Sequence, residues 1–398
     1  MNEKLNSLIE KHEDWMIEQR RDIHQNPEPS CEEFRTSKKV YDILNELGLE
    51  VKRGFYKTGV VGVIDGARPG KTIALRFDMD ALEMEEKTGL YFASAQKELM
   101  HACGHDGHTA MGLGAARILN EMKDQIAGKV KLIFQPAEED APGGGGAQHM
   151  IEDGVLKNPT VDAALGMHIW PDLEFGQVGT RPGVIMGASD PFTIDVIGQG
   201  VHASQPYQGI DPIVIGSQIV NNLQTIVSRN IDPFEQAVIS IGVFQGGTRY
   251  NTIPDQVSLK GTVRTFDQEV RDKVYKKIES IAEKTASSLG GEVKLDYTFG
   301  YPPVNNDVEM FRTAHKSIRK MLGAEKAVEV DRPAPTGEDF AFFAQEVPAT
   351  FLWLGCNKEG EETPKLHSPY FNFDEKILST GVKVLTATAI NWLNEQEV

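Results

Sequence analysis

Short β-rich runs that alternate with helical patterns are the feature that most constrains the fold of this 398-residue chain. The first runs lie at residues 50–53, 59–64, 72–77, 130–134 and 163–168, and helical patterns lie at 34–47, after His108 and at 148–152. This alternation predicts an α/β sheet whose strand ends carry the chemistry. Ser30 and Glu33 predict a capping box at the start of the first helix, which Gly48 ends.

The pattern changes in the middle of the chain. Between Phe192 and Arg264 the strands alternate polar with apolar residues around an apolar helix at 213–227, and an amphipathic helix follows at 268–289. Such strands predict an inserted α+β domain whose sheet is exposed on one face. The α/β pattern then returns, with helices at 308–321 and 375–393 and a strand at 350–354. We therefore expect a catalytic domain of residues 1–187 and 301–398, interrupted by an inserted domain of residues 188–300.

The charge balance narrows the possible partners. With 41 basic and 58 acidic residues the formal net charge is −17, which repels nucleic-acid phosphates and anionic membrane surfaces. The first residues show no targeting signal and no later run is apolar enough to span a membrane, so we expect a cytoplasmic protein with neither nucleic-acid nor membrane partners. Cys31, Cys103 and Cys356 are too few, and odd in number, for a disulfide framework, and we expect them to be thiols.

The segment His101–His108 combines three histidines with a cysteine. Imidazole and thiolate are the ligands that zinc and its neighbours prefer, and the spacing of Cys103 and His105 lets both side chains project toward one site. The segment therefore predicts a metal site. We expect His101 and His108 to orient ligands through their second ring nitrogen.

Three acids, Glu138, Glu139 and Asp140, directly follow an apolar strand. Adjacent carboxylates at a strand end repel one another unless a cation relieves them, so one of them is suited to bind a metal. Its neighbour can then accept a proton from the attacking water, which is general-base catalysis. His168 and His367 add imidazoles at further loop positions, although each alone is more typical of a structural histidine.

Seven short motifs, spread over nearly the whole chain, can be compared with those of known protein families. They are residues 21–28, 76–82, 101–108, 135–139, 198–206, 251–254 and 366–369 with Phe371. Together they resemble the M20 metallopeptidase family, in its branch of aminoacylases, hippurate hydrolases and auxin-conjugate hydrolases. The resemblance implies an α/β, phosphorylase/hydrolase-like zinc-peptidase catalytic domain with an inserted α+β, ferredoxin-like lid and dimerisation domain. It also implies a homodimer or homotetramer formed through the lid.

The resemblance implies a five-residue set of ligands for two divalent metal ions, which would be zinc, manganese, cobalt or nickel. The set is Cys103, His105, Glu139, His168 and His367. Glu138 would deprotonate the attacking water and later protonate the leaving amine. Asp78 and Asp80 stay outside the set, and Asp80 is expected to support its loop rather than a ligand.

In the inserted domain, the resemblance makes His202 a lid histidine that reaches an active site and polarises the scissile carbonyl. Asn251 and Arg264 would hold the amide or carboxylate of the substrate. Near the expected cleft, Glu83 stands where this branch usually has proline and Gln148-His149 is unusual. We expect both departures to affect which substrate the cleft accepts.

The implied reaction is metal-dependent hydrolysis of an N-acyl amino acid, such as an N-acetyl or hippurate-like compound, to a carboxylic acid and a free amino acid. A dipeptidase or carboxypeptidase of the same family is an alternative. Two other classes stay open: a thiol amidase with Cys103 as nucleophile and His105 as its base, and a non-catalytic binding protein stabilised by metal. Activity that survives metal removal would favour the thiol amidase.

Overall fold

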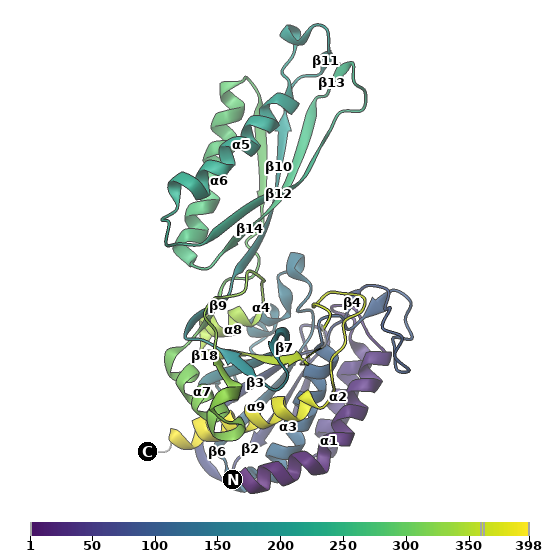
Figure 1. The fold of residues 1–398 in the computed structure, drawn as a ribbon, viewed down its shortest axis with the longest axis vertical. Coiled ribbons are helices and arrows are strands. Elements are labelled where there is room, and N and C mark those ends of the chain that lie inside the picture. The colour runs from purple at the N-terminus through teal and green to yellow at the C-terminus, as the bar shows by residue number, and fades with distance from the viewer. Residues whose placement is uncertain (1, 359, 361–362, 397–398) are drawn as a thin grey trace. The chain divides into compact units, whose positions relative to one another are not determined.

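The computed structural model describes residues 2–358, 360 and 363–396. The chain divides into two compact units, and each is described separately. Unit 1 is formed by Met1–Ile185, Asn305–Arg332 and Asp339–Val398, and unit 2 by Met186–Val304 and Pro333–Glu338. Most of unit 2 is therefore a single insertion into unit 1, and both chain termini belong to unit 1 (Figure 1). The short second segment of unit 2 was not indicated by the sequence pattern.

Unit 1 is built on an eight-stranded sheet with the order β1-β2-β6-β3-β7-β18-β8-β17. The strands are β1 (Glu50–Phe55), β2 (Gly59–Asp65), β3 (Arg68–Asp78), β6 (Ala127–Gln135), β7 (Ala163–Glu174), β8 (Val178–Thr180), β17 (Ala327–Glu329) and β18 (Ala349–Asn357). Strands β6, β3, β7 and β18 run parallel at its centre, whereas β1 and β2 form an antiparallel edge. Parallel strands are buried on both faces, which explains their continuous apolar runs in the sequence.

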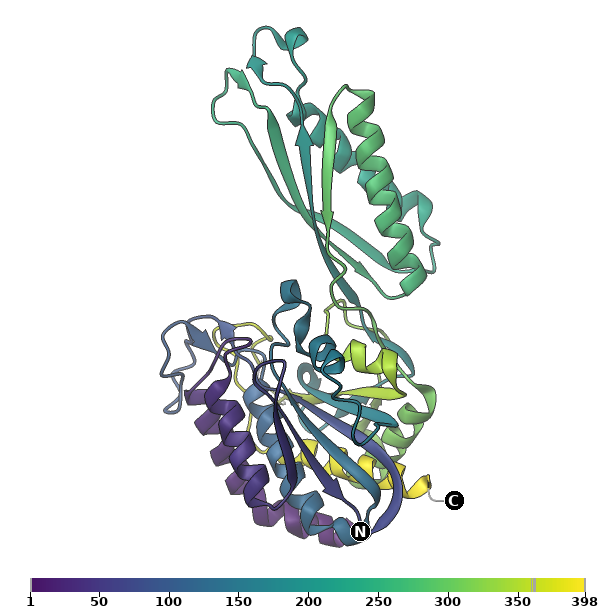
Figure 2. The same ribbon diagram turned by 180° about the vertical axis from the view of Figure 1, so that it is seen from behind.

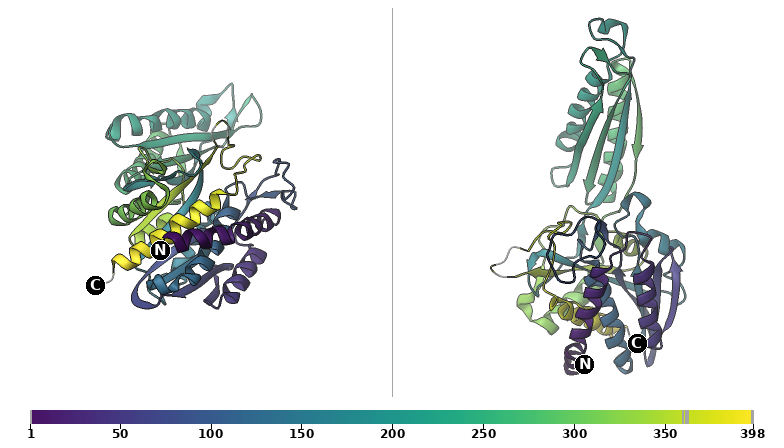
Figure 3. Two further views of the ribbon diagram at one scale, coloured as in Figure 1. Left: turned by 60° about the horizontal axis from the view of Figure 1, so that its bottom comes forward. Right: turned by 90° about the vertical axis from the view of Figure 1, so that its right-hand side faces the viewer.

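Helices cover both faces of this sheet. They are α1 (Asn2–Gln25), α2 (Phe34–Glu46), α3 (His105–Glu121), α4 (Gly145–Glu152), α7 (Val308–Leu322), α8 (Phe340–Glu346) and α9 (Ile377–Glu395). Leu132 of β6 faces the core that it shares with α1, α3 and α9, and the purple α1 and yellow α9 lie side by side in Figure 3. Lys131 points to the opposite face, where its ammonium donates to the carbonyl oxygen of Val155. The predicted α/β class is confirmed.

Two helices of unit 1 differ from the prediction. Helix α1 was not predicted, although Leu5 and Ile9 begin a series of buried apolar residues at helical spacing. Helix α3 begins at His105 rather than after His108, because Gly104, with φ of 89°, turns the chain and forms the N-cap. Both histidines therefore lie in the first turn of a helix.

The predicted capping box is wrong. Helix α2 begins at Phe34 without a side-chain cap. The Ser30 hydroxyl donates to Asp80 at 2.6 Å, and the Glu33 carboxylate accepts hydrogen bonds from other segments of unit 1. Both side chains are thus directed into the unit and away from the helix end.

Unit 2 contains a four-stranded antiparallel sheet with the order β12-β14-β10-β15, covered by two helices on one face (Figures 1 and 2). Its elements are β10 (Ala188–Ile197), β11 (Val201–His202), α5 (Pro212–Asn230), β12 (Ala237–Gly246), β13 (Thr252–Ile253), β14 (Gln256–Thr265), α6 (Gln268–Ser288) and β15 (Glu292–Tyr297). Ile194 and Val196 of β10 are buried against the helices, whereas Ile197 is exposed. The predicted α+β insert with one open sheet face is confirmed. Two short strands, β9 (Gly183–Met186) and β16 (Val304–Asn306), flank it in the sequence.

A buried ion pair joins the two ends of unit 2. The Arg271 guanidinium of α6 donates to both oxygens of Asp190 on β10, at 2.9 Å and 2.5 Å. Asp190 also accepts from the backbone N–H of Gly300 at 3.0 Å, and the Ser189 N–H donates to the Tyr301 carbonyl oxygen at 3.1 Å. The long segment of this unit therefore begins and ends at adjacent points.

Two predictions from composition can be compared with the structure. Cys31, Cys103 and Cys356 are free, buried thiols, as predicted. Among the residues that the structure describes, no helix combines the length and the apolar composition needed to cross a membrane.

Candidate metal centre

The carboxyl ends of three neighbouring strands meet at one edge of the unit 1 sheet. Strands β3 and β6 run parallel with Asp78 opposite Gln135, so the loops after them bring Asp80 and Glu138–Glu139 to the same edge. Strand β7 runs parallel to β3 on its other side and carries His168. This edge is where α/β sheets place their ligands.

Two further segments complete the cluster. The turn at Gly104 places His105 at the start of α3, directly after the loop that carries Cys103. His367 lies in another loop with φ of 61°, and its backbone N–H donates to the Ala102 carbonyl oxygen at 2.9 Å. This hydrogen bond fixes the His367 loop beside Cys103.

The structure brings all five predicted ligands together. Cys103, His105 and His168 form one group, and Cys103, Glu139 and His367 form another; within each group the ligand atoms lie within 4.8 Å of one another. The Cys103 sulfur lies 3.3 Å from His168 Nε2, and His367 Nε2 lies 3.2 Å from Glu139 Oε1. The two groups therefore share one sulfur atom.

Hydrogen bonds determine which lone pairs face the cluster. Nδ1 of His105 donates to the Asp80 carbonyl oxygen at 2.9 Å, and Nδ1 of His168 donates to the Ile169 carbonyl oxygen at 2.7 Å. In their neutral forms both rings therefore carry the proton on Nδ1 and present a lone pair on Nε2. His105 Nε2 has no hydrogen-bond partner among the described residues and lies 3.9 Å from Glu139 Oε1.

A bound cation would satisfy the lone pairs that Nε2 of His105 and Nε2 of His168 direct toward the cluster. Glu139 Oε1 is also buried without a hydrogen bond from the described part of the chain. Burial alone lowers the pKa of His105, but neighbouring carboxylates, Asp78 first, outweigh it and raise that pKa to about 10. Burial and the Glu139 carboxylate raise the pKa of the Cys103 thiol well above its usual range. Imidazole, carboxylate and thiolate are ordinary ligands of divalent metals, so this donor set fits a metal centre.

Glu138, the predicted base, lies beside this cluster. Its side chain is 9% exposed, and its Oε2 lies 4.0 Å from His105 Nε2. Glu138, His105 and Glu139 form a further group of ligand-type atoms within 4.8 Å of one another. A water molecule in reach of the ligand atoms would therefore also be in reach of this carboxylate.

Asp80 contacts a candidate ligand, so the prediction that it supports only its loop is wrong. Its Oδ1 lies 3.2 Å from His105 Nδ1, next to the backbone oxygen that accepts from the same ring. Its Oδ2 accepts from the Glu139 N–H at 2.9 Å and from the Ser30 hydroxyl at 2.6 Å. A single carboxylate, in the loop after β3, thus orients the His105 ring at the start of α3 and fixes the loop of Glu139 after β6.

Neither His101 nor His108 bonds to a candidate ligand side chain, contrary to the prediction. His108 Nδ1 donates to Asp78 Oδ1 at 2.6 Å, and its Nε2 accepts from the Ile169 N–H at 2.9 Å. Helix α3 already begins at His105, so His108 lies three residues into its first turn and bonds to Asp78 and Ile169 of the strands. Both ring nitrogens of His101 are buried without a hydrogen-bond partner among the described residues, and burial lowers its pKa to about 4.

The three candidates in unit 2 lie on strand β11, in the turn before β13 and on strand β14. His202 is exposed on β11, and its Nδ1 accepts from the Ser204 N–H at 3.2 Å. The carbonyl oxygen of Asn251 accepts from the Ala203 N–H at 3.1 Å, so Asn251 is a neighbour of His202. Arg264 lies on the sheet strand β14, is half-buried and donates within its own strand, and burial lowers its pKa.

Sequence reasoning missed a buried network behind the strand ends. Arg76 donates to Asp78 at 2.6 Å, to Gln135 at 2.8 Å and to Asp339 at 2.5 Å. Asp339 also accepts from the side chain of Gln135 and from the Ala147 N–H. A charged residue inside the apolar run at 72–77 was a signal that a buried partner exists, although nothing in the sequence identifies Asp339 as that partner.

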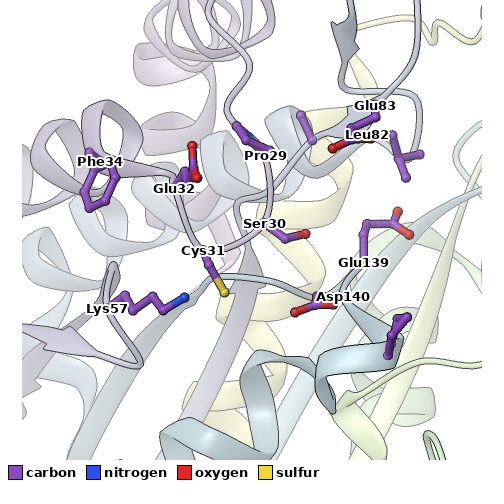
Figure 4. Close-up of a pocket in the computed structure, with 12 residues that line it drawn as sticks. Pro29, Ser30, Cys31, Glu32, Phe34, Lys57, Leu82, Glu83, Glu139 and Asp140 are labelled. Atoms are coloured by element: carbon purple, nitrogen blue, oxygen red, sulfur yellow. The ribbon is translucent and has the colours of Figure 1, made fainter.

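A pocket of about 770 Å³ opens beside the cluster, within unit 1 (Figure 4). Its wall includes Ser30, Cys31, Lys57, Glu83 and Glu139. Of the two unusual segments noted in the sequence, Glu83 lines this pocket. His149 instead stacks on Tyr56, with ring centroids 4.2 Å apart, and supports the β1–β2 turn that carries Lys57.

Comparisons with known proteins agree with this geometry. A model of the peptidase family M20/M25/M40 matches residues 74–391. The N-acetyl-L-cysteine deacetylase of Bacillus subtilis (strain 168) is 40% identical over 391 residues, which are 98% of this chain and 90% of that protein. Thermostable carboxypeptidase 1 of Saccharolobus solfataricus is 42% identical over 397 residues, 99% of each chain. The crystal structure of a dinuclear metal-binding M20 peptidase from Bacillus subtilis matches with a TM-score of 0.84 and 36% identity, covering 98% of this chain and 100% of that one.

Proposed function

The chain belongs to the peptidase family M20/M25/M40, and from this premise we propose that it is a metal-dependent amidohydrolase that splits N-acyl amino acids into a carboxylic acid and a free amino acid. The family resemblance stated from the motifs is thereby confirmed. The observation that carries the proposal is the pair of ligand groups that share Cys103, with Glu138 beside them. The similarity to an N-acetyl-L-cysteine deacetylase supports the substrate class.

We propose that each ligand group holds one divalent ion. The first group is Cys103, His105 and His168, and the second is Cys103, Glu139 and His367. The unpaired Nε2 of His105 and the similarity to a dinuclear metal-binding peptidase support this assignment. Ligands of mixed nitrogen, oxygen and sulfur character accept zinc, manganese, cobalt or nickel. When bound, the two ions would polarise the scissile carbonyl and lower the pKa of the attacking water.

The protein's own residues would move the proton. Glu138 is suited to take it from the attacking water, because its buried carboxylate lies beside both ligand groups without belonging to either. The same carboxylate would return the proton to the leaving amine. Asp80 would keep the His105 ring and the Glu139 loop at a fixed spacing during this exchange.

In unit 2 we propose that His202 polarises the substrate carbonyl and that Asn251 and Arg264 bind the substrate. Because the Ser204 N–H donates to Nδ1 of His202, the neutral ring keeps its proton on Nε2, where it is available to a developing oxyanion. The Arg264 guanidinium is suited to a bidentate grip on a carboxylate. The proposal includes a homodimer or homotetramer assembled through the inserted domain, which light scattering would test. The cytoplasmic location stays a prediction.

A carboxypeptidase is the second candidate, because the similar Saccharolobus solfataricus protein is a carboxypeptidase. A thiol amidase has less support. His105 donates through Nδ1 to Asp80, and Cys103 lies beside His168 instead. The raised pKa of the Cys103 thiol also disfavours a nucleophilic thiolate when no cation is bound. A non-catalytic binding protein would leave Glu138 without a role.

Metal reconstitution with a substrate panel tests these alternatives together. The protein is stripped with a chelator, reloaded with each of the four metals, and offered N-acetyl and N-benzoyl amino acids, dipeptides and longer peptides while released amine is measured. We expect amine from N-acyl amino acids only after reloading. Faster release from peptides would favour the carboxypeptidase, and activity that survives chelation would favour the thiol amidase. Metal-loaded protein that releases no amine would overturn the proposal.

A further inference from the structure

Glu33, which the sequence suggested as half of a capping box, lies at the junction of three segments. Its side chain is fully buried, at 0% exposed. Its Oε1 accepts from the backbone N–H groups of Cys31 at 3.0 Å and Ala137 at 2.9 Å, and its Oε2 accepts from the Thr58 hydroxyl at 2.5 Å. One carboxylate therefore joins the chain before α2, the β1–β2 turn and the loop after β6.

The Ala137 contact comes directly before the proposed base. Ala137 is buried with φ of 55°, a conformation that costs a residue other than glycine roughly 1–2 kcal/mol. Its N–H donates to Glu33, so this strained turn is held from outside the loop. After the base, the Glu139 N–H donates to Asp80 at 2.9 Å. The backbone N–H groups of the residues on either side of Glu138 are thus each held by a buried carboxylate.

The Cys31 contact fixes a wall of the pocket. Cys31 has φ of 69° and lines the pocket together with Ser30, as Figure 4 shows. The Ser30 hydroxyl donates to Asp80. Glu33 and Asp80 therefore hold two parts of the site. Their carboxylates fix the loop that carries Glu138, and they also fix the pocket wall against which a bound substrate group would lie.

We propose that Glu33 is a positioning residue, whose carboxylate sets the spacing between the Glu138 base and the pocket wall at Cys31. The proposal rests on the proposed function, in which Glu138 is the base. The side-chain hydrogen bonds of Glu33 go to Cys31, Ala137 and Thr58, so Glu33 would act on the base through the Ala137 N–H and on the wall through the Cys31 N–H. Without this contact the Ala137 turn would relax, and a displacement of about 1 Å at a reacting group lowers the rate by roughly 10²-fold.

Two conservative variants separate the length of the Glu33 side chain from its charge. Glu33→Gln keeps the length: its amide oxygen can accept from Cys31 and Ala137, and the Thr58 hydroxyl can turn to accept from the amide nitrogen. Glu33→Asp keeps the charge but is one methylene shorter, so it cannot reach both N–H groups from the same backbone position. In the metal-loaded protein we expect Gln to retain most of kcat and Asp to lose about 10²-fold. KM should change little, because Ser30 remains bonded to Asp80.

Thr58→Val is the matched control for stability. It removes only the hydroxyl that donates to Oε2 of Glu33 and leaves the Ala137 N–H bonded. We expect a lower Tm with kcat near that of the wild type. If Thr58→Val lowers kcat as much as Glu33→Asp at an equal loss of Tm, Glu33 acts only through stability. If Glu33→Gln is as impaired as Glu33→Asp, the charge matters and not the spacing; either result overturns the proposal.

Crystal structures of the two Glu33 variants give a readout that needs no substrate. The Ala137–Glu138 peptide should be displaced in Glu33→Asp and unmoved in Glu33→Gln. A peptide that is unmoved in both variants refutes the positioning role. If the wild type releases no amine from any substrate, the proposed function fails, and the crystal structures still decide the role of Glu33.

Discussion

The two units of this protein place their polar side chains in opposite ways. In unit 1, Cys103, His105 and Glu138 are 7%, 0% and 7% exposed, and buried neighbours hold the rings and loops around them. In unit 2, His202 is exposed, and the buried Asp190 and Arg271 bind each other. Around its ligand cluster unit 1 therefore uses buried charge to preorganise chemistry, whereas the buried Asp190–Arg271 pair of unit 2 holds the architecture of that unit.

The sheets explain this difference. The parallel strands of unit 1 are covered on both faces, so the loops at their carboxyl ends lie in an environment from which much water is excluded, where charge interactions are strong. The antiparallel sheet of unit 2 has one open face, and the β11–β13 ribbon that carries His202 lies outside that sheet. Substitutions at the unit 1 site should therefore change kcat, and substitution of the unit 2 ion pair should change stability.

Removing the proposed base should produce the largest effect. Glu138→Gln keeps the shape of the side chain but cannot accept the proton of the attacking water. We expect kcat to fall by about 10³-fold, with metal content and Tm unchanged. Steady-state kinetics and elemental analysis of the purified variant check this. A kcat within about tenfold of the wild type would remove Glu138 from the role of base.

Breaking the ion pair of unit 2 should have the next largest effect, on stability. Asp190→Ala leaves the Arg271 guanidinium buried without its partner carboxylate, which destabilises by about 3 kcal/mol. Denaturant unfolding measures the change. The control Arg312→Ala removes an exposed pair with Glu309 in unit 1 and should cost under about 1 kcal/mol. If both variants lose the same free energy of unfolding, burial does not make the Asp190–Arg271 pair more stabilising than the exposed pair.

His202→Ala tests whether an exposed side chain of unit 2 takes part in the chemistry. If its Nε2–H stabilises an oxyanion, kcat should fall by about 10²-fold. Because the side chain is exposed and its hydrogen-bond partner is the adjacent Ser204, Tm should stay close to that of the wild type. Unchanged kinetics would confine the chemistry to unit 1.

The smallest expected effect is a pH dependence of stability in unit 1. Burial lowers the pKa of His24, but hydrogen bonds to Asp106 and Glu86 outweigh it and raise the pKa to about 8. The protonated ring thus stabilises the folded state fully below its unfolded pKa of about 6.5, and this contribution is lost as the pH rises through 8. The difference in Tm between wild type and His24→Gln should be larger at about pH 6 than at about pH 9. A difference independent of pH would contradict this assignment.

The sequence could predict what depends on local spacing. Cys103 and His105 are two residues apart at a helix start, and Glu138 and Glu139 follow one strand, so their clustering needed only the α/β pattern. Local spacing does not predict contacts between distant segments, and His168 and His367 joined the ligand set only through the family resemblance. Glu33 has the local pattern of a helix cap, and only the fold reveals that it reaches Ala137, 104 residues later. Asp80 was likewise expected to serve one loop, because the approach of the Glu139 N–H depends on the pairing of β3 with β6.

The two ends of the long segment of unit 2 are hydrogen-bonded to each other, and this affects how easily the sequence between them can change. Ser189 and Tyr301 are hydrogen-bonded neighbours, and Asp190 holds Gly300, so the first and last strands of the insertion start and stop together. A segment whose ends meet adds little loop-closure entropy to the chain that receives it. The long segment of unit 2 could therefore change in length or sequence without a change in the order of the strands in the unit 1 sheet.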